Sequence, residues 1–168
     1  MKRPLLPREM RNSSDQGREK VKKVFGMSDL SRFIKAQEND YKRALSEIRS
    51  GHKRSHWIWY IFPQIDGLGF SSTAKYYAIK DRQEAVDYLK DDLLRKRLIE
   101  ISEALLHLKS CDPGEVMGYP DDLKLRSSMT LFCEVAPEVE VFQKVLDKFF
   151  GGELDQRTIE LLEGNVDD

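Results

Sequence analysis

The chain has 168 residues, the length of one ordinary domain, and 40% of them are hydrophobic, which is enough for a single compact core. No apolar run approaches the roughly 20 residues needed to cross a bilayer, and no secretory signal is recognisable, so we expect a cytoplasmic protein outside the membrane. Cys111 and Cys133 stand alone, which indicates neither a disulfide framework nor a zinc site.

The first segment of the chain, residues 1–27, is basic. It holds eight Lys/Arg against three Asp/Glu, a net charge of +5, while the whole chain carries −1 and the remainder therefore −6. Because this segment has few aromatic residues, it has too little apolar surface to offset the entropy of ordering. We predict a disordered basic tail over 1–27, a helical domain over 28–164 and a disordered end over 165–168. A basic tail can contact nucleic acid or an acidic surface, or it can be a solvated extension.

Two helices are predicted next. Apolar residues recur on one face from a cap at Ser28 or Asp29 up to Gly51, which is typical of a long amphipathic helix. Gln37 falls on that apolar face, so its amide must find a partner in the core or reach a ligand. Ser55 is then a candidate cap for a short, almost wholly apolar helix that must stop before Pro63 and that we expect to be buried.

Capping residues and apolar spacing predict the remaining helices. We expect helices from Ser71 or Ser72 to Ile79, from Asp81 to Leu89, from Leu94 to Leu108, over Asp121–Phe132, over Glu138–Phe150 and over Asp155–Leu162. No alternating strand pattern or internal repeat competes with them. The predicted fold class is all-α, as a single compact multi-helix domain.

The segment from Ser55 to Gln64 contains both tryptophans and a histidine. His56 and Tyr60 are four residues apart, so on one helix they would share a face and form a candidate catalytic acid and base; alternatively, both are core residues with satisfied polar tips. Trp57 and Trp59 would point to opposite sides, so that one can stack on a ligand while the other anchors the core. The spacing of His52 and His56 would suit a metal on a continuous helix, but Ser55 as a cap between them argues against it, and no metal site is predicted.

A glycine turn follows, with the pattern Gly67-Leu68-Gly69-x-Ser71-Ser72 before a helix. Backbone N–H groups, hydroxyls and the helix dipole make this a candidate anion site, to which Lys75 would add charge. The alternative is an ordinary tight turn.

A second polar cluster lies on the helix predicted over Asp121–Phe132. Lys124, Ser127 and Ser128 share one side of that helix, where a cation beside hydroxyls would suit a phosphate or a ribose, although serine is also tolerated where helices pack closely. We predict that six polar residues converge around one cavity beside Trp57 or Trp59, namely Gln37, His56, Gln64, Ser71, Lys124 and Ser127.

Four motifs between Asp29 and Phe150 carry a family resemblance. They are Arg32-Phe33-x3-Gln37-x3-Tyr41, Ser55-His56-Trp57-x-Trp59-x-Ile61-Phe62-Pro63-Gln64, Gly67-Leu68-Gly69-x-Ser71, and Asp122-Leu123-Lys124-Leu125-x-Ser127-Ser128-Met129-Thr130-Leu131-Phe132. This stretch resembles the bacterial domain-of-unknown-function family that is often mislabelled "calpastatin". The resemblance implies a mainly helical single domain of unestablished activity.

Three functional hypotheses follow from these residues. The motif chemistry favours the binding or processing of a phosphate-bearing, nucleotide-type small molecule, such as NAD-derived ADP-ribose, in the aromatic and glycine-turn region. The alternative is a non-enzymatic helical protein-interaction module. Nucleic-acid binding ranks last, because it rests on the tail alone and a body with a charge of −6 repels phosphates. The sequence predicts no cofactor and does not settle whether the protein is an enzyme.

Overall fold

The computed structural model describes residues 28–167, with side chains described through residue 164; the predicted disorder of residues 1–27 falls outside this range. The chain divides into two units, one ending at Leu30 and one beginning at Ser31, and the architecture below is that of the second. Apart from one isolated bridge between Ile65 and Ile79, residues 28–167 contain no β-structure, which confirms the all-α prediction.

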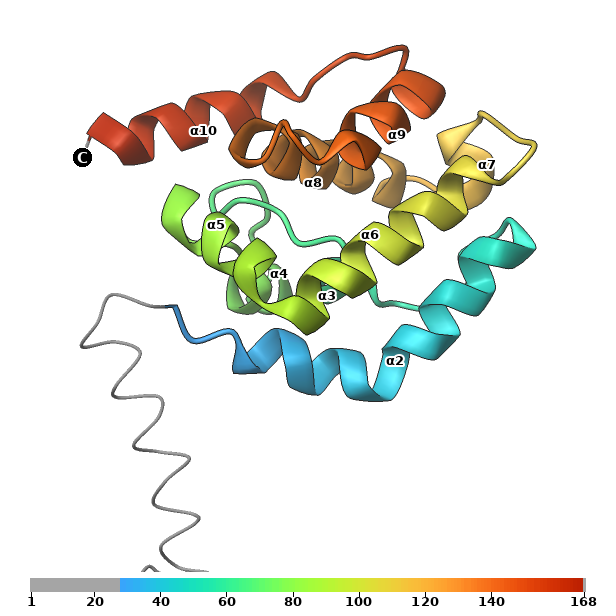
Figure 1. Cartoon of the computed structure of the whole chain (residues 1–168), viewed down its shortest axis with the longest axis horizontal. Helices are drawn as coiled ribbons and strands as arrows, with labels where there is room; N and C mark the ends of the chain where they lie inside the picture. The colour runs from blue at the N-terminus through green and yellow to red at the C-terminus, as the bar shows by residue number, and fades with distance from the viewer. Residues whose placement is uncertain (1–27, 168) are drawn as a thin grey trace, which may run out of the picture. The chain divides into compact units, whose positions relative to one another are not determined.

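Nine helices are present between Ser31 and Asp167 (Figure 1). They are α2 (Ser31–Ser50), α3 (Ile58–Ile61), α4 (Ser72–Tyr77), α5 (Arg82–Lys90), α6 (Asp92–Leu106), α7 (Pro113–Met117), α8 (Asp121–Val135), α9 (Glu140–Phe150) and α10 (Gln156–Asp167). The end of α10 lies beyond residue 164, where the sequence predicted the helical domain to stop.

Helix α8 is the centre of the packing, since it contacts α3, α5, α7, α9 and α10. Figure 1 shows α9 and α10 lying along it, while α6 packs against both α2 and α9. Phe132 of α8 joins these layers, because its ring centre lies 5.3 Å from that of Tyr88 in α5 and 5.9 Å from that of Phe142 in α9. All three rings are fully buried, so this aromatic chain forms part of one continuous core.

Two local predictions were wrong, and one helix was missed. Ser55 does not cap α3, which begins at Ile58 without a side-chain cap. Helix α4 ends at Tyr77 rather than Ile79, because the backbone of Ile79 instead pairs with the segment around Ile65. Helix α7 was not predicted at all, although its signals are visible in retrospect: Asp112 caps its N-terminus and Pro113 occupies its first turn.

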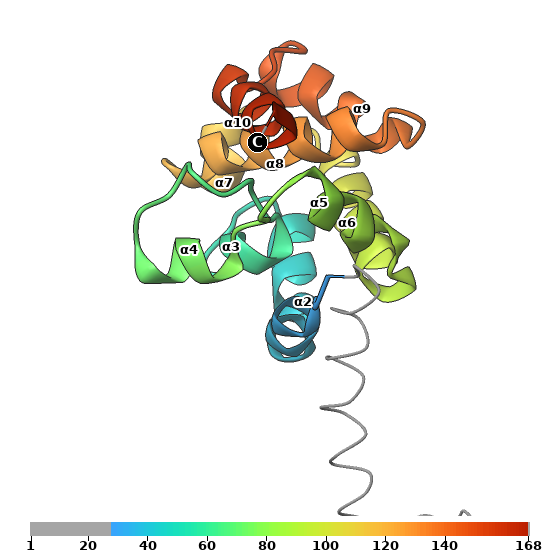
Figure 2. The ribbon, with the colours of Figure 1, turned by 90° about the vertical axis from the view of Figure 1, so that its left-hand side faces the viewer.

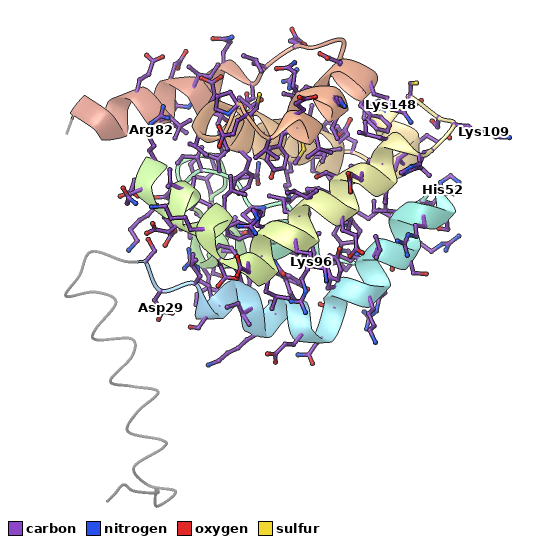
Figure 3. The ribbon with its side chains drawn as sticks, in the orientation of Figure 1. Asp29, His52, Arg82, Lys96, Lys109 and Lys148 are labelled. Carbon is purple, nitrogen blue, oxygen red and sulfur yellow. The ribbon has the colours of Figure 1, made fainter. Side chains whose placement is uncertain are left out.

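Hydrogen bonds from a lysine side chain close the C-terminal end of α6. The Lys148 ammonium of α9, labelled in Figure 3, donates to three carbonyl oxygens at the C-terminal end of α6: Leu105 at 3.1 Å, Leu106 at 3.0 Å, and Leu108. A cation there satisfies orphan carbonyls and complements the helix dipole. None of the helices described is both long and apolar enough to span a bilayer.

Candidate functional site

A cleft of about 460 Å³ opens where three segments far apart in sequence meet, residues 59–74, residues 120–127 and Asp155. Figure 2 shows the loop before α4 lying near the N-terminal half of α8, the arrangement that brings these segments together. The residues that line the cleft are Trp59, Gln64, Leu68, Gly69, Phe70, Ser71, Ala74, Pro120, Leu123, Lys124, Arg126, Ser127 and Asp155. Its walls therefore combine aromatic, aliphatic, cationic, hydroxyl and carboxylate groups.

The two tryptophans take opposite roles. Trp57 is buried, 1% exposed, and its indole Nε1 donates to the Glu47 carboxylate over 2.9 Å. Trp59 is half-buried and lines the cleft, with the Lys124 ammonium 5.2 Å from its ring centre. Trp57 is thus the core anchor, and Trp59 presents its ring to the cleft under a cation.

Glu47 of α2 organises the loop that leads into α3. Its carboxylate accepts hydrogen bonds from the backbone N–H of Arg54 and of Ser55, from the Ser55 hydroxyl and from Trp57, at 2.6–3.0 Å. Burial by itself would raise the pKa of Glu47, but these hydrogen bonds outweigh it and lower the pKa to about 2. An ionised carboxylate therefore fixes the approach to the segment that carries Trp59.

Lys124 is held in place by a chain of charges. Asp121, one helical turn earlier, lies 3.5 Å from the Lys124 ammonium and 2.6 Å from that of Lys53, whose side chain is only 5% exposed. The other cation of the cleft, Arg126, pairs with Glu153 at 3.0 Å, and its Nε is buried without a hydrogen-bond partner among the described residues. Each cation of the cleft thus already has a carboxylate partner, which moderates the positive potential.

Asp155, just before α10, brings a carboxylate to the cleft. Its Oδ2 accepts hydrogen bonds from Ser127 Oγ at 2.7 Å and from Thr158 Oγ1 at 2.5 Å. Its backbone N–H donates to Thr130 Oγ1 of α8 at 2.9 Å. Asp155 is therefore anchored to α8 at both its backbone and its side chain.

Packing inside the protein explains the glycine turn. Gly67 has a φ of +109°, and a Cβ at that position would lie 3.0 Å from the Leu161 side chain; a Cβ on Gly69 would lie 2.6 Å from that of Ala74. Ser71 caps α4 by accepting from the Ala74 N–H at 3.1 Å. The turn is thus required by the fold, while Gly69 and Ser71 also line the cleft.

The predicted convergence is found for four of its six residues: Gln64, Ser71, Lys124 and Ser127 line the cleft beside Trp59. Gln37 does not, because it is buried and its amide donates to the Tyr60 carbonyl at 2.8 Å and the Tyr88 hydroxyl at 3.0 Å. His56 does not either, since it is exposed and precedes α3.

His56 and Tyr60 do not share a helix, which removes the geometry on which their pairing as acid and base was predicted. Tyr60 is buried and donates to Asp40. Its burial is the larger cause, and this hydrogen bond the next, that raises the pKa of its phenol above the ordinary value. His52, beyond the end of α2 in Figure 3, is also exposed, and its Nδ1 lies 3.1 Å from the Glu115 carbonyl.

The other predicted ligand residues lie outside the cleft lining. Ser72 and Lys75 are exposed on α4, and Gly67 packs against α10. Ser128 is fully buried, and its hydroxyl has no hydrogen-bond partner among the described residues. Sequence reasoning in turn missed Asp155 and Arg126. Asp155 has the signature of an ordinary helix cap, so its position in the sequence gives no separate signal for a cleft residue.

The pattern of the DUF1810 family, described as a protein of unknown function, matches residues 27–162. The chain belongs to the DUF1810 family. The crystal structure of another protein, the conserved hypothetical protein Rv1873 from Mycobacterium tuberculosis, is similar to this DUF1810 chain with a TM-score of 0.79 and 44% sequence identity, over 80% of this chain and 96% of that one. No curated protein matches.

Proposed function

We propose that the cleft binds a small phosphate-bearing molecule of the nucleotide type, of which NAD-derived ADP-ribose is an example. The observation that carries this proposal is the meeting of the Trp59 ring, the Gly69–Ser71 backbone, the Lys124 ammonium and the Ser127 hydroxyl in one cleft. An aromatic face suits a base, and a cation with hydroxyls suits phosphate and sugar.

The dimensions of the cleft support a small ligand. Its volume of about 460 Å³ falls within the roughly 300–1,000 Å³ that small-molecule sites occupy. Phe70 lines the cleft and is 83% exposed, so it offers a ligand a second aromatic ring. His56 and Tyr60 are absent from the lining, so the proposal concerns binding and assigns no catalytic residue.

Exposed apolar side chains favour a second candidate, a protein-interaction surface. Phe70 and Leu123 line the cleft with 83% and 42% of their surface exposed, and Tyr119, next to the lining residue Pro120, is 81% exposed. Exposed aromatic residues grouped in this way are typical of protein contacts.

A nucleic-acid role would rest on residues 1–27 alone, and we propose none. For the cell compartment we propose the cytoplasm, because Cys111 and Cys133 are both free thiols.

A thermal-shift and calorimetric titration with ADP-ribose, ADP and inorganic phosphate tests the proposed function. We expect ADP-ribose at a hundred times its Kd to add about 2.7 kcal/mol of stability. Lys124→Met should weaken binding, whereas Lys75→Met, which removes an exposed lysine outside the cleft, should leave it unchanged. If neither nucleotide binds the unmodified protein, the proposal fails and the interaction surface becomes the preferred function.

A further inference from the structure

The Asp155 carboxylate is held in a fixed direction. Hydroxyls from two helices donate to its Oδ2: Ser127 of α8 and Thr158 of α10. Thr130 accepts from its backbone N–H and itself donates to the Arg126 carbonyl at 2.8 Å, and both threonines are fully buried. A carboxylate restrained in this way is preorganised, so a ligand that meets it does not have to order it.

At Asp155 and Ser127 themselves the remaining hydrogen-bonding capacity consists of acceptors, while the neighbouring Arg126 Nε is a donor without a partner among the described residues. Asp155 Oδ1 makes no hydrogen bond to any residue of the described chain, and an ionised carboxylate only accepts. Ser127 has a single hydroxyl proton, which it donates to Asp155 Oδ2 at 2.7 Å, with the Leu123 carbonyl as a more distant acceptor at 3.1 Å. With that proton engaged, Ser127 has only lone pairs left for a ligand, so the ligand must bring the donors.

The charge of a ligand group and its hydrogen-bond donors decide whether it fits beside Asp155 and Ser127. A phosphate has no suitable donors and is repelled by the Asp155 carboxylate. An ammonium or guanidinium has donors, but it would share the cleft with the cations of Lys124 and Arg126. The pairing edge of adenine, the base of the proposed ligand, offers a donor beside an acceptor, which does not match two acceptors. Two neighbouring neutral hydroxyls each bring one donor, so together they match the acceptors Asp155 Oδ1 and Ser127 Oγ.

We propose that Asp155, with Ser127 beside it, is the specificity-determining residue of the cleft and accepts hydrogen bonds from the vicinal hydroxyls of a ribose. This inference rests on the proposed function and deepens it, because Asp155 and Ser127 would select ribonucleotides over deoxyribonucleotides and over phosphate alone. They also orient the ligand: the sugar lies at Asp155, the base against Trp59 and the phosphate toward Lys124. A carboxylate on ribose hydroxyls is a recurrent way of reading nucleotides.

The test is calorimetric titration of the full chain with ADP, 2′-deoxy-ADP and inosine diphosphate. We expect 2′-deoxy-ADP to bind about ten- to a hundredfold more weakly than ADP, since it lacks a donor to a charged acceptor. Inosine diphosphate, which keeps both ribose hydroxyls but lacks the base amino group, should bind as ADP does.

Three variants test which residues discriminate between ADP and 2′-deoxy-ADP. In Asp155→Asn and in Ser127→Ala the affinity ratio between ADP and 2′-deoxy-ADP should fall toward one, because an acceptor is lost at the sugar. Asp92→Asn, at an exposed carboxylate of α6, is the matched control and should leave the ratio unchanged. If Asp155→Asn does not fold, Ser127→Ala and the ligand series on the unmodified protein still decide.

The outcomes separate this inference from the proposed function. Equal affinities for ADP and 2′-deoxy-ADP would overturn the role of Asp155 while leaving nucleotide binding intact. Weak binding of inosine diphosphate with undiminished binding of 2′-deoxy-ADP would show that the wall reads the base and would also overturn it. If none of the three nucleotides binds, the proposed function fails, and this inference fails with it.

Discussion

Neutralising Glu47 should destabilise the fold in a manner that depends on pH. Glu47 is only 8% exposed and accepts four hydrogen bonds, three of them at Oε1 from Arg54, Ser55 and Trp57. Glu47→Gln keeps an oxygen for those three donors and removes the charge, so it tests the ionised state with little change in packing. The variant therefore isolates the contribution of the carboxylate charge.

The magnitude follows from the pKa of Glu47, which lies at about 2 in the folded protein against an ordinary value of 4.5. This difference corresponds to about 3 kcal/mol of unfolding free energy. Because the folded pKa is depressed, the stabilisation is fully present above about pH 4.5 and is lost as the pH falls through about 2. Glu47→Gln should thus cost about 3 kcal/mol at pH 7 and close to nothing near pH 2.

Urea denaturation followed by far-UV circular dichroism between pH 2 and 7 measures both quantities. The control is Glu38→Gln, at an exposed position of the same helix, which should leave the unfolding free energy within about 0.5 kcal/mol of the unmodified protein throughout. If Glu47→Gln and the unmodified protein lose stability in parallel between pH 4.5 and pH 2, the carboxylate does not stabilise the folded state as an anion and the reasoning is refuted.

Three further changes test the fold. Trp57→Ala should cost about 3–5 kcal/mol in urea denaturation and Trp59→Ala clearly less, because only Trp57 leaves a buried cavity; equal losses would contradict this division. Lys148→Met should lower the unfolding free energy by about 1–2 kcal/mol by removing donors from the end of α6, whereas Lys144→Met on the exposed side of α9 should have almost no effect. Deleting residues 1–26 should leave the melting temperature and helicity nearly unchanged, since this basic segment has few core-forming residues, and a large loss of either would refute that expectation.

The sequence was sufficient for the helices whose signals are local. Asp81 predicted the start of α5 because a side-chain cap needs only the next helical turn, and its carboxylate does accept from the Glu84 N–H at 2.9 Å. Gly51 likewise marked the end of α2 and takes a φ of +90°. Apolar periodicity predicted the presence of α6 and α9, and the buried residues of both helices match the apolar spacing in the sequence.

Local sequence patterns gave a wrong or ambiguous prediction where a polar side chain forms its hydrogen bond with a residue distant in sequence. Ser55 has the chemistry of a cap, but its N–H and hydroxyl are both engaged by Glu47 on α2, and the helix begins later. Gln37 was equally ambiguous, since a buried amide can await a ligand or bond to the core, and only the positions of Tyr60 and Tyr88 show that it bonds to the core.

The sequence by itself determined the fold class, the opposition of Trp57 and Trp59, and most of the polar groups beside Trp59. The fold class follows from the helical repeat, whereas Trp57 lies just before α3 and Gln64 and Ser71 lie outside the helices. Only the tertiary structure decided which tryptophan faces the cleft, and only it brought Asp155 to the cleft wall beside Ser127. Contacts between residues so far apart depend on how α8 and α10 pack, and the spacing of residues along one helix carries no information about that packing.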